Sequence, residues 1–344
     1  MITGDNGITA SSIATKIGME HSYIIITGDM LDDMTDDKLQ ETVKEAAIFS
    51  RVIPEHKMRI VKAFKENGEI VAMTGDGVND APALKYSDIG IAMGKRGSEV
   101  TREAADLVLM DDNFTTIVET VKDGRRIYDN IRRAVGYVFT IHIPIALASL
   151  LAPILGVAPV ALMLLPIHVV LLELLIDPTC SIVLERLPAE SDIMERKPRD
   201  PKEKLLNMQT LLKSVIQGLV IFAASFGTYY VILANDPANA PVARAMGLTT
   251  IMLSNLFLVQ VNGSDHDFVI RSIVRLAKDL VMWAVSIGTL LMLGIILYTP
   301  LSSFLKLAPL TAGQLFTSIG IAAVAVLWYE IIKVIKYVLR RVIK

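Results

Sequence analysis

The chain has 344 residues and a mass of 37.7 kDa, and 52% of its residues are hydrophobic. Its mean hydropathy is +0.49 and charged residues make up only 20%, against roughly 25% in an average soluble domain. Such an apolar excess is typical of chains with membrane spans. The net charge of −2 excludes a generally basic, nucleic-acid-binding chain. The single cysteine, Cys180, excludes an intramolecular disulfide and a paired-cysteine metal site.

The charged residues divide the chain into two parts. Residues 1–134 are dense in Asp, Glu, Lys and Arg, whereas long apolar stretches alternate with short charged loops from Val135 onward. The N-terminus has no basic segment followed by an apolar run, so we predict no signal peptide there. We therefore expect a soluble unit followed by a membrane unit.

The soluble part alternates short β-rich runs with helical patterns, which predicts an α/β unit with a largely parallel sheet. Buried strands are predicted at 23–28, 69–73 and 88–93, and a helix at 55–67. Met1 and Ile2 resemble the end of a strand, whereas a strand normally has about five or six residues. We therefore expect residues that precede this unit in a longer protein.

Two carboxylates follow one of these strands. Asp76 and Asp80 are four residues apart, and Gly75 and Gly77 let a ligand approach the backbone closely. Ligands of open α/β sheets lie outside the carboxyl ends of the strands. Two carboxylates with the amide of Asn79 suit Mg²⁺, which keeps water and phosphate in the rest of its shell. An ordinary polar turn is the alternative for these residues taken alone.

Three motifs follow one another in this part: Thr3-Gly4-Asp5-Asn6, Pro54-Glu55-His56-Lys57 and the eleven residues from Thr74 to Leu84. In this order they resemble the P-type ATPases, cation pumps with a phosphorylation domain of the haloacid-dehalogenase type. The resemblance continues through 91–94 and 111–114 into the membrane part. It implies a partial haloacid-dehalogenase-like phosphorylation domain followed by a six-helix transmembrane bundle.

The resemblance also implies roles for single residues. Thr3 and Gly4 would hold the phosphoryl oxygens, and Lys57 would neutralise their charge. Asp76 would bind the cofactor Mg²⁺, and Asp80 would order the site around phosphate and metal together with its neighbour Asn79. Such a site stabilises a transferring phosphoryl group electrostatically.

The phosphorylated Asp of the family lies in an Asp-Lys-Thr-Gly-Thr motif, which does not occur in these residues. In the family this Asp, the nucleotide-binding domain that holds most of the ATP, the actuator domain and four spans all precede the position of Thr3. We therefore expect the chain to be the C-terminal part of a pump. It would need the missing N-terminal portion as a partner and would be inactive by itself.

Six apolar segments have about the 20 residues that cross a bilayer as a helix. They lie at 135–155, 160–183, 211–233, 246–262, 279–298 and 315–334. We accordingly predict a soluble domain at 1–113, a stalk helix at 114–134 and a membrane domain at 135–344.

Lys and Arg gather in the loops after the second and fourth spans and in the tail, and Arg244 and Lys306 are the main exceptions in the other loops. Because positive loops stay inside, we predict a multi-pass protein of a bacterial plasma membrane, with its soluble domain and C-terminus in the cytoplasm.

Ionisable residues within spans are candidates for function. Glu173 and Asp177 share one helix face in the second span, and Pro178 would loosen backbone carbonyls beside them. Together these oxygens predict a site for a hard cation, with a structural carboxylate pair as the alternative. His142, in the first span, is either a further member of the ion path or a helix–helix hydrogen bond.

By resemblance to calcium pumps, Asp177 stands at the ion-binding Asp and Glu173 at an Asn ligand. Ile145, Ile176 and Met252 stand where a two-site calcium pump has Glu, Thr and Glu. We therefore predict one cation site, with Ca²⁺ as first choice and Mn²⁺, Mg²⁺, a proton or a monovalent ion as alternatives.

The leading hypothesis is thus an ATP-driven cation transporter that works through an aspartyl-phosphate. A membrane-tethered phosphatase of the dehalogenase type is a second hypothesis, but it does not explain the carboxylates within the membrane. A third is a non-catalytic half-pump that binds an ion or a partner.

Overall fold

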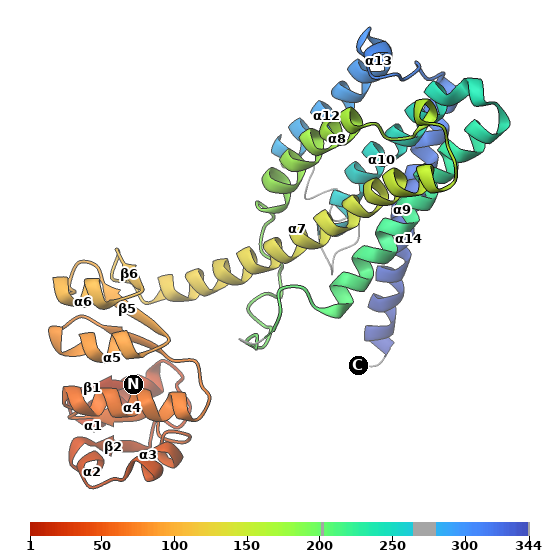
Figure 1. Cartoon of the computed structure of the whole chain (residues 1–344). Coiled ribbons are helices and arrows are strands. Elements are labelled where there is room, and N and C mark those ends of the chain that lie inside the picture. Colours follow the sequence, from red (N-terminus) through yellow and green to blue (C-terminus); the bar gives the residue numbers. More distant parts are fainter. Residues whose placement is uncertain (201–202, 264–279, 343–344) are drawn as a thin grey trace. The chain divides into compact units, whose positions relative to one another are not determined.

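The computed structural model describes residues 1–200, 203–263 and 280–342, without the side chains of residues 177, 179–181 and 336–342. The chain forms two compact units, Met1–Val121 and Lys122–Lys344, and Figure 1 shows the elements of each.

The first unit contains two three-stranded sheets. One has the order β1-β3-β2 and the other β4-β5-β6, and every pairing in the described residues is parallel. The strands are β1 (Ile2–Thr3), β2 (Ile25–Thr27), β3 (Ile48–Ser50), β4 (Ala72–Gly75), β5 (Ile89–Met93) and β6 (Leu107–Leu109). The prediction of a parallel α/β unit is confirmed.

Helices connect these strands. They are α1 (Gly7–Lys16), α2 (Gly28–Asp32), α3 (Asp36–Thr42), α4 (Pro54–Glu66), the 3₁₀ turn η1 (Val78–Asp80), α5 (Ala81–Tyr86) and α6 (Glu99–Ala104). Strands β3 and β6 have only three residues each and were not predicted.

Helix α4 joins the cores of the two sheets. Its Ile60 packs with Phe49 in the core beside the first sheet, and the adjacent Val61 packs with Met73 beside the second. Burying each of these large side chains stabilises the unit by about 1.5–3 kcal/mol. Pro54 begins the helix, where a missing N–H costs nothing. Because α4 packs into both cores, the position of Lys57 in its first turn is fixed relative to both sheets.

Helix α7 (Thr115–Ile154) is unbroken over 40 residues. The Asn113 side chain accepts a hydrogen bond from the Thr115 N–H at 3.0 Å, which caps the first turn. Asp111 accepts from the Thr116 hydroxyl at 2.7 Å, and this bond lowers the pKa of the Asp111 carboxyl. The start of α7 is therefore fixed by local side chains.

The second unit is helical. After α7 it contains η2 (Pro159–Ala161), α8 (Pro166–Pro178), a π-helix η3 (Thr179–Leu184), α9 (Met208–Asn235), η4 (Pro237–Asn239), α10 (Ala240–Asn262), α12 (Leu280–Tyr298), α13 (Leu301–Phe304) and α14 (Ala312–Val342). Among the described residues, six helices are long and apolar enough to cross a membrane. The predicted six-helix bundle is confirmed, while the loop after the fourth span lies outside the described residues.

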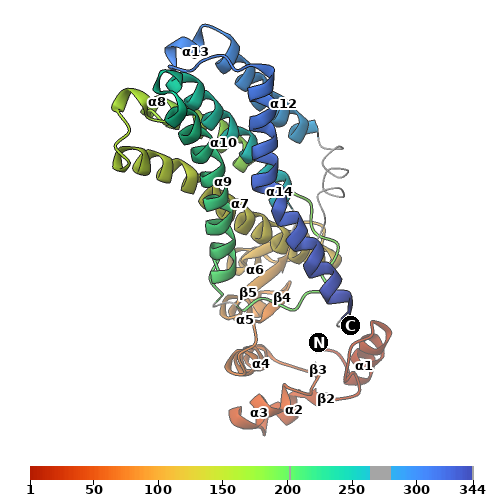
Figure 2. The ribbon, with the colours of Figure 1, turned by 90° about the vertical axis from the view of Figure 1, so that its right-hand side faces the viewer.

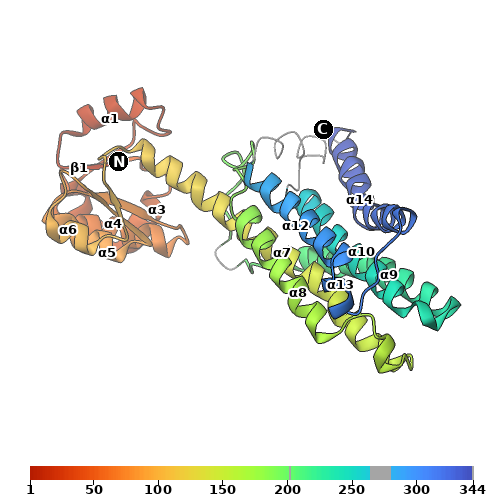
Figure 3. The ribbon, with the colours of Figure 1, turned by 90° about the horizontal axis from the view of Figure 1, so that it is seen from above.

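Helix α10 is the most buried span of this unit. It packs against α9, α12 and α14, and Figure 2 shows α9, α10 and α14 side by side. Helices α8 and α12 run alongside each other in Figures 1 and 3. The core of the unit therefore lies around α10.

The first half of α7 is tied to the segment that follows η3. Glu190 is 6% exposed and lies between the guanidinium groups of Arg133 and Arg196. Arg196 also reaches Asp129 of α7 at 2.9 Å. Hydrogen bonds to Asp192 and Glu190 raise the pKa of Arg196 above its usual value. Because removing one member would leave a buried charge unpaired, this network holds the segment against α7.

We predict that Gly218→Ala destabilises the second unit. A Cβ at Gly218 of α9 would lie 2.8 Å from the Thr140 carbonyl oxygen and 2.8 Å from Ile143 Cβ of α7. Overpacking of this kind costs about 1–3 kcal/mol, so the melting temperature of the purified chain should fall. The matched control is Gly227→Ala on the same helix, where a Cβ meets nothing within 4 Å. Equal melting temperatures for the two variants would contradict the close approach of α7 and α9.

Candidate functional site

Asp80 is the centre of the polar site in the first unit. It is 7% exposed, and its Oδ1 accepts a hydrogen bond from the ammonium of Lys57. Its Oδ2 accepts the backbone N–H groups of Asp76 and Gly77, each at 3.3 Å. The structure therefore brings together Lys57, Asp80 and the Asp76 backbone, three of the groups that the motifs singled out.

Two residues that sequence reasoning missed hold this loop in place. The Thr101 hydroxyl, which is fully buried, donates to the Gly77 carbonyl at 2.9 Å. The Ser98 N–H donates to the Asp76 carbonyl at 2.9 Å. Ser98 also caps α6 by accepting from the Thr101 N–H at 3.2 Å. The capping pattern was visible in the sequence, but its contact with the Asp76 loop was not.

The side chains of Asp76 and Asn79 are exposed beside this centre. In the described part of the chain no other side chain engages the Asp76 carboxylate, which leaves it available to a metal ion. Within the described residues, no three His, Cys, Asp or Glu side chains lie close enough together to hold a metal ion by themselves. The donor set fits Mg²⁺ held by one or two carboxylates, with water and phosphate completing its shell.

Thr3 and Gly4 stand at the carboxyl end of β1. The Thr3 hydroxyl accepts the Asp5 N–H at 3.1 Å, and a Cβ at Gly4 would meet nothing within 4 Å. Within the described residues no hydrogen bond joins either of them to Lys57 or Asp80. Their role at the site, like that of Asn79, stays a prediction.

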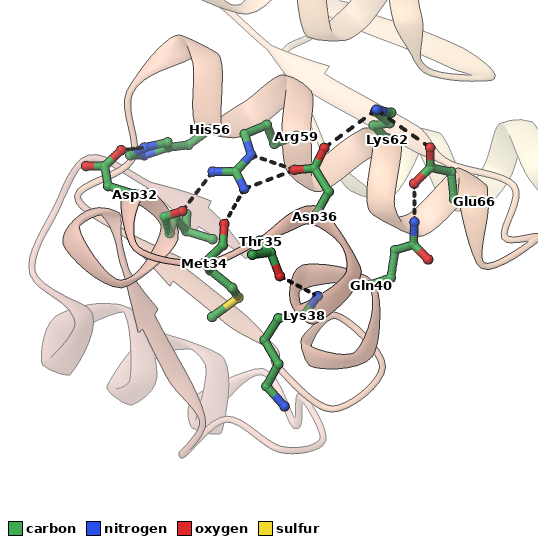
Figure 4. A network of polar contacts seen from close by, with 11 residues as sticks. Asp32, Met34, Thr35, Asp36, Lys38, Gln40, His56, Arg59, Lys62 and Glu66 are labelled. Atoms are coloured by element: carbon green, nitrogen blue, oxygen red, sulfur yellow. Dashed lines mark hydrogen bonds and ion pairs between the residues drawn. The ribbon is translucent and has the colours of Figure 1, made fainter.

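A network of polar contacts fixes the start of α4, as Figure 4 shows. His56 is 3% exposed and its Nε2 lies 2.8 Å from Asp32 Oδ1, while its Nδ1 accepts the Ile53 N–H at 3.4 Å. One turn further, Arg59 donates to Asp36 and to the Leu31 carbonyl. These contacts hold the first turns of α4, which carry Lys57.

The second candidate site lies between α7 and α8. Nε2 of His142 is 3.2 Å from Oε1 of Glu173, and its Nδ1 is 2.7 Å from the Val138 carbonyl. Because a carbonyl can only accept, Nδ1 must carry a hydrogen. The Nε2 of this ring then faces the Glu173 carboxyl. The structure thus joins two of the predicted residues in one close pair.

Asp177, the third predicted residue, has its side chain outside the described residues. Its backbone belongs to α8, which continues through Pro178 into the π-helix η3. Proline lacks the N–H that an α-helix needs at this position, and π-turns often occur at functional sites. The helix therefore changes its hydrogen-bond pattern after Pro178 and does not stop at Asp177.

An apolar pocket adjoins this site. Its lining includes Leu172 and Ile176 of α8, Met252 and Asn255 of α10, and Tyr137 of α7. Ile176 and Met252, two of the positions that depart from calcium-pump ligands, thus share one apolar surface. Asn255, whose side-chain oxygen is buried, is a polar residue here that sequence reasoning did not single out.

Comparisons with known proteins agree with this organisation. Residues 1–88 match the model of haloacid dehalogenase-like hydrolases, and residues 161–335 match that of the cation-transporting ATPase C-terminus. A calcium-transporting ATPase of Bacillus subtilis is 38% identical over 94% of this chain and 36% of its own length.

Two further relatives show the same pattern. Calcium-transporting ATPase 1 of Lactococcus lactis is 35% identical over 99% of this chain and 38% of its own length. Probable cation-transporting ATPase F of Mycobacterium tuberculosis is 35% identical over 83% of this chain and 31% of its own length. The chain thus spans about a third of the length of these relatives.

We predict that Gly75→Ala disrupts the Asp80 centre. A Cβ at Gly75 would lie 2.5 Å from Asp80 Cβ and 2.9 Å from its Cγ, so Asp80 must move. At a cost of about 1–3 kcal/mol, amide exchange in residues 74–84 should become at least about fivefold faster by mass spectrometry.

Gly77→Ala is the control for this substitution. The nearest atom to a Cβ at Gly77 is Asp80 Oδ2 at 3.8 Å, an ordinary contact. Its exchange should stay within about twofold of the parent chain, since such changes fall within about 0.5 kcal/mol. Similar exchange in both variants would contradict the described packing of Gly75 on Asp80.

Proposed function

This chain belongs to the family of P-type cation-transporting ATPases. We propose that it is part of an ATP-driven pump that moves Ca²⁺ across a membrane through a single cation site. The contact of His142 with Glu173 between two apolar helices is the observation that carries this proposal. A carboxyl group between apolar helices is costly unless it has a use. A tethered phosphatase would have no need of it.

The first unit would stabilise the transferring phosphoryl group. Lys57, held by Asp80, provides positive charge at the carboxyl ends of the strands. Thr3 and Gly4 would supply donors to the phosphoryl oxygens, and Asn79 would order the site. Asp76 would hold Mg²⁺, with Asp80 beside it. Bound Mg²⁺ would neutralise negative charge on the phosphoryl oxygens.

The partner that we propose is the N-terminal portion of the pump. It would carry the phosphorylated Asp and the domain that binds most of the ATP. The pairing of the strands supports a place for it, since β1 pairs only with β3 and β4 only with β5 among the described residues. An added parallel strand along either edge would end beside Thr3, the last residue of β1, or beside Asp76, which follows β4.

One cation site explains the membrane unit better than two. Glu173 and Asp177 would supply carboxylate oxygens, and the helix change after Pro178 would expose backbone carbonyls. Ile176 and Met252 line an apolar pocket, and Ile145 is buried at 5% exposure. None of these three side chains has an oxygen atom that could bind a second hard cation. Residues 114–134, which form the start of α7 from Thr115 onward, would act as the stalk that links phosphorylation to this site.

We further propose that the first unit and the C-terminus face the cytoplasm of a bacterial cell, with the six spans in its plasma membrane. The support is the gathering of Lys and Arg in alternate loops and in the tail.

Asp177→Asn and Glu173→Gln are expected to abolish Ca²⁺-stimulated phosphorylation in a pump completed with the missing N-terminal portion. Each substitution removes a carboxylate charge that a hard cation needs. Phosphorylation would be measured with labelled ATP over a Ca²⁺ titration. Glu185→Gln, at an exposed carboxylate beyond η3, is the control and should keep a normal response. A normal Ca²⁺ response in both site variants would overturn the assignment.

The isolated 344-residue chain is expected to hydrolyse no ATP, because it contains no Asp-Lys-Thr-Gly-Thr motif. Phosphate release would be measured with Mg²⁺ and Ca²⁺ present. Hydrolysis by the purified chain that disappears in Lys57→Met would show that a nucleophile within these residues had been overlooked.

A further inference from the structure

Arg244 is a fully buried cation inside a span. It lies in the second turn of α10 and is 1% exposed. Its Nε donates to the Leu162 carbonyl at 2.8 Å, its NH2 to the Val160 carbonyl at 2.8 Å and its NH1 to the Lys306 carbonyl at 2.5 Å. In the described part of the chain all its acceptors are backbone oxygens.

Two neighbouring side chains bind the same two loops. The Tyr229 hydroxyl of α9 donates to the Ala161 carbonyl at 2.6 Å. His168 of α8 accepts the Leu165 N–H on Nδ1, so its Nε2–H donates to the Leu305 carbonyl at 2.7 Å. Five carbonyls from two loops, at 160–162 and 305–306, are therefore held by Arg244, Tyr229 and His168, which we name the loop clamp.

The first of these loops is the turn between α7 and α8. These two helices carry His142 and Glu173, which meet at 3.2 Å. His168 precedes Glu173 by five residues, about 7.5 Å along the helix axis. A shift of this turn would move α8 along α7 and separate the pair. The clamp thus fixes the hairpin that carries the candidate cation site.

The second loop has a constrained backbone. Lys306 has a φ of 53°, a left-handed conformation that is uncommon for a residue other than glycine. The Leu307 N–H closes this turn on the Ser302 carbonyl at 2.8 Å. Its carbonyls at Leu305 and Lys306 point to His168 and Arg244. The loop therefore presents preformed acceptors to the clamp.

Only a guanidinium suits this place. Its charge persists when it is buried, and its planar fork can direct N–H groups at several acceptors at once. A lysine ammonium is a compact charge on a flexible stem and cannot span the same three carbonyls. A merely packed helix would have no reason to bury so costly a group.

We propose that Arg244 is a positioning residue of the cation site, which holds the α7–α8 hairpin in the register where Glu173 meets His142. This rests on the proposed function only for the identity of the ion. The register itself is a property of the chain and is measurable without any ion.

The first experiment measures the loops and the hairpin in the purified full chain without added cation. In Arg244→Gln, hydrogen exchange at 159–163 and at 305–308 should become at least tenfold faster. Arg244→Lys should leave at least one of the two loops unprotected. Ser225→Ala is the control and should leave both loops unchanged, since in the part of the chain that the structure describes its buried hydroxyl bonds only within α9.

The register is tested by cross-linking. Cysteines replace His142 and Glu173 in a Cys180→Ser background, and a short bifunctional methanethiosulfonate joins them. Arg244→Gln should slow this cross-link at least fivefold. Open loops with an unchanged cross-link would mean a local fastening without a positioning role, and protected loops in Arg244→Lys would remove the need for a guanidinium. Either result overturns the proposal.

Tyr229→Phe is a second variant for the same measurements, used if Arg244→Gln does not fold. It removes the bond to Ala161 alone, so exchange should rise at 159–163 and not at 305–308, and the cross-link should slow at least twofold. Equal opening of both loops or an unchanged cross-link would overturn the proposal.

A Ca²⁺ titration of the same chains separates this proposal from the proposed function. Arg244→Gln should weaken Ca²⁺ binding at least tenfold. An unchanged affinity in Arg244→Gln would overturn the positioning role. If the parent chain binds no Ca²⁺, the choice of ion fails, and the exchange and cross-linking results still decide the register.

Discussion

In a hydrocarbon environment every polar group must find its partner within the protein, because no water competes for it. This constraint organises the second unit. Arg244 is satisfied by carbonyls of two loops, and Glu173 by His142. Each of these groups joins segments that are distant in the sequence, so the cost of burying it is offset only in the assembled fold.

In the first unit, the buried carboxylate of Asp80 likewise finds its hydrogen-bond partners within the protein. Asp80 receives Lys57 on one oxygen and two backbone N–H groups on the other, and Gly75 leaves the space it needs. Hydrogen bonds to a charged acceptor are roughly twice as strong as neutral ones. The loop of Asp76 is therefore held by its own backbone, while the Asp76 side chain remains exposed.

The sequence predicted those features that depend on neighbouring residues. The spacing of Asp76 and Asp80 pointed to one loop, and runs of apolar residues predicted six spans. Strands β3 and β6, of three residues each, were not predicted. Arg244 was assigned to a loop before a span at 246–262, whereas α10 begins at Ala240 and buries it. Its acceptors lie 62, 82 and 84 residues away, and no local pattern reports such partners.

The burial of α10 also bears on how the protein is made. This helix has the lowest mean hydropathy of the six spans and the largest share of its surface covered by protein. Its buried Thr249, Thr250 and Ser254 face other helices instead of lipid. Because transfer into the bilayer is favoured by apolar side chains and opposed by an arginine, α10 has the weakest drive to leave the translocation channel by itself. We therefore expect its insertion to depend on the helices that cover it, of which α9 directly precedes it in the chain.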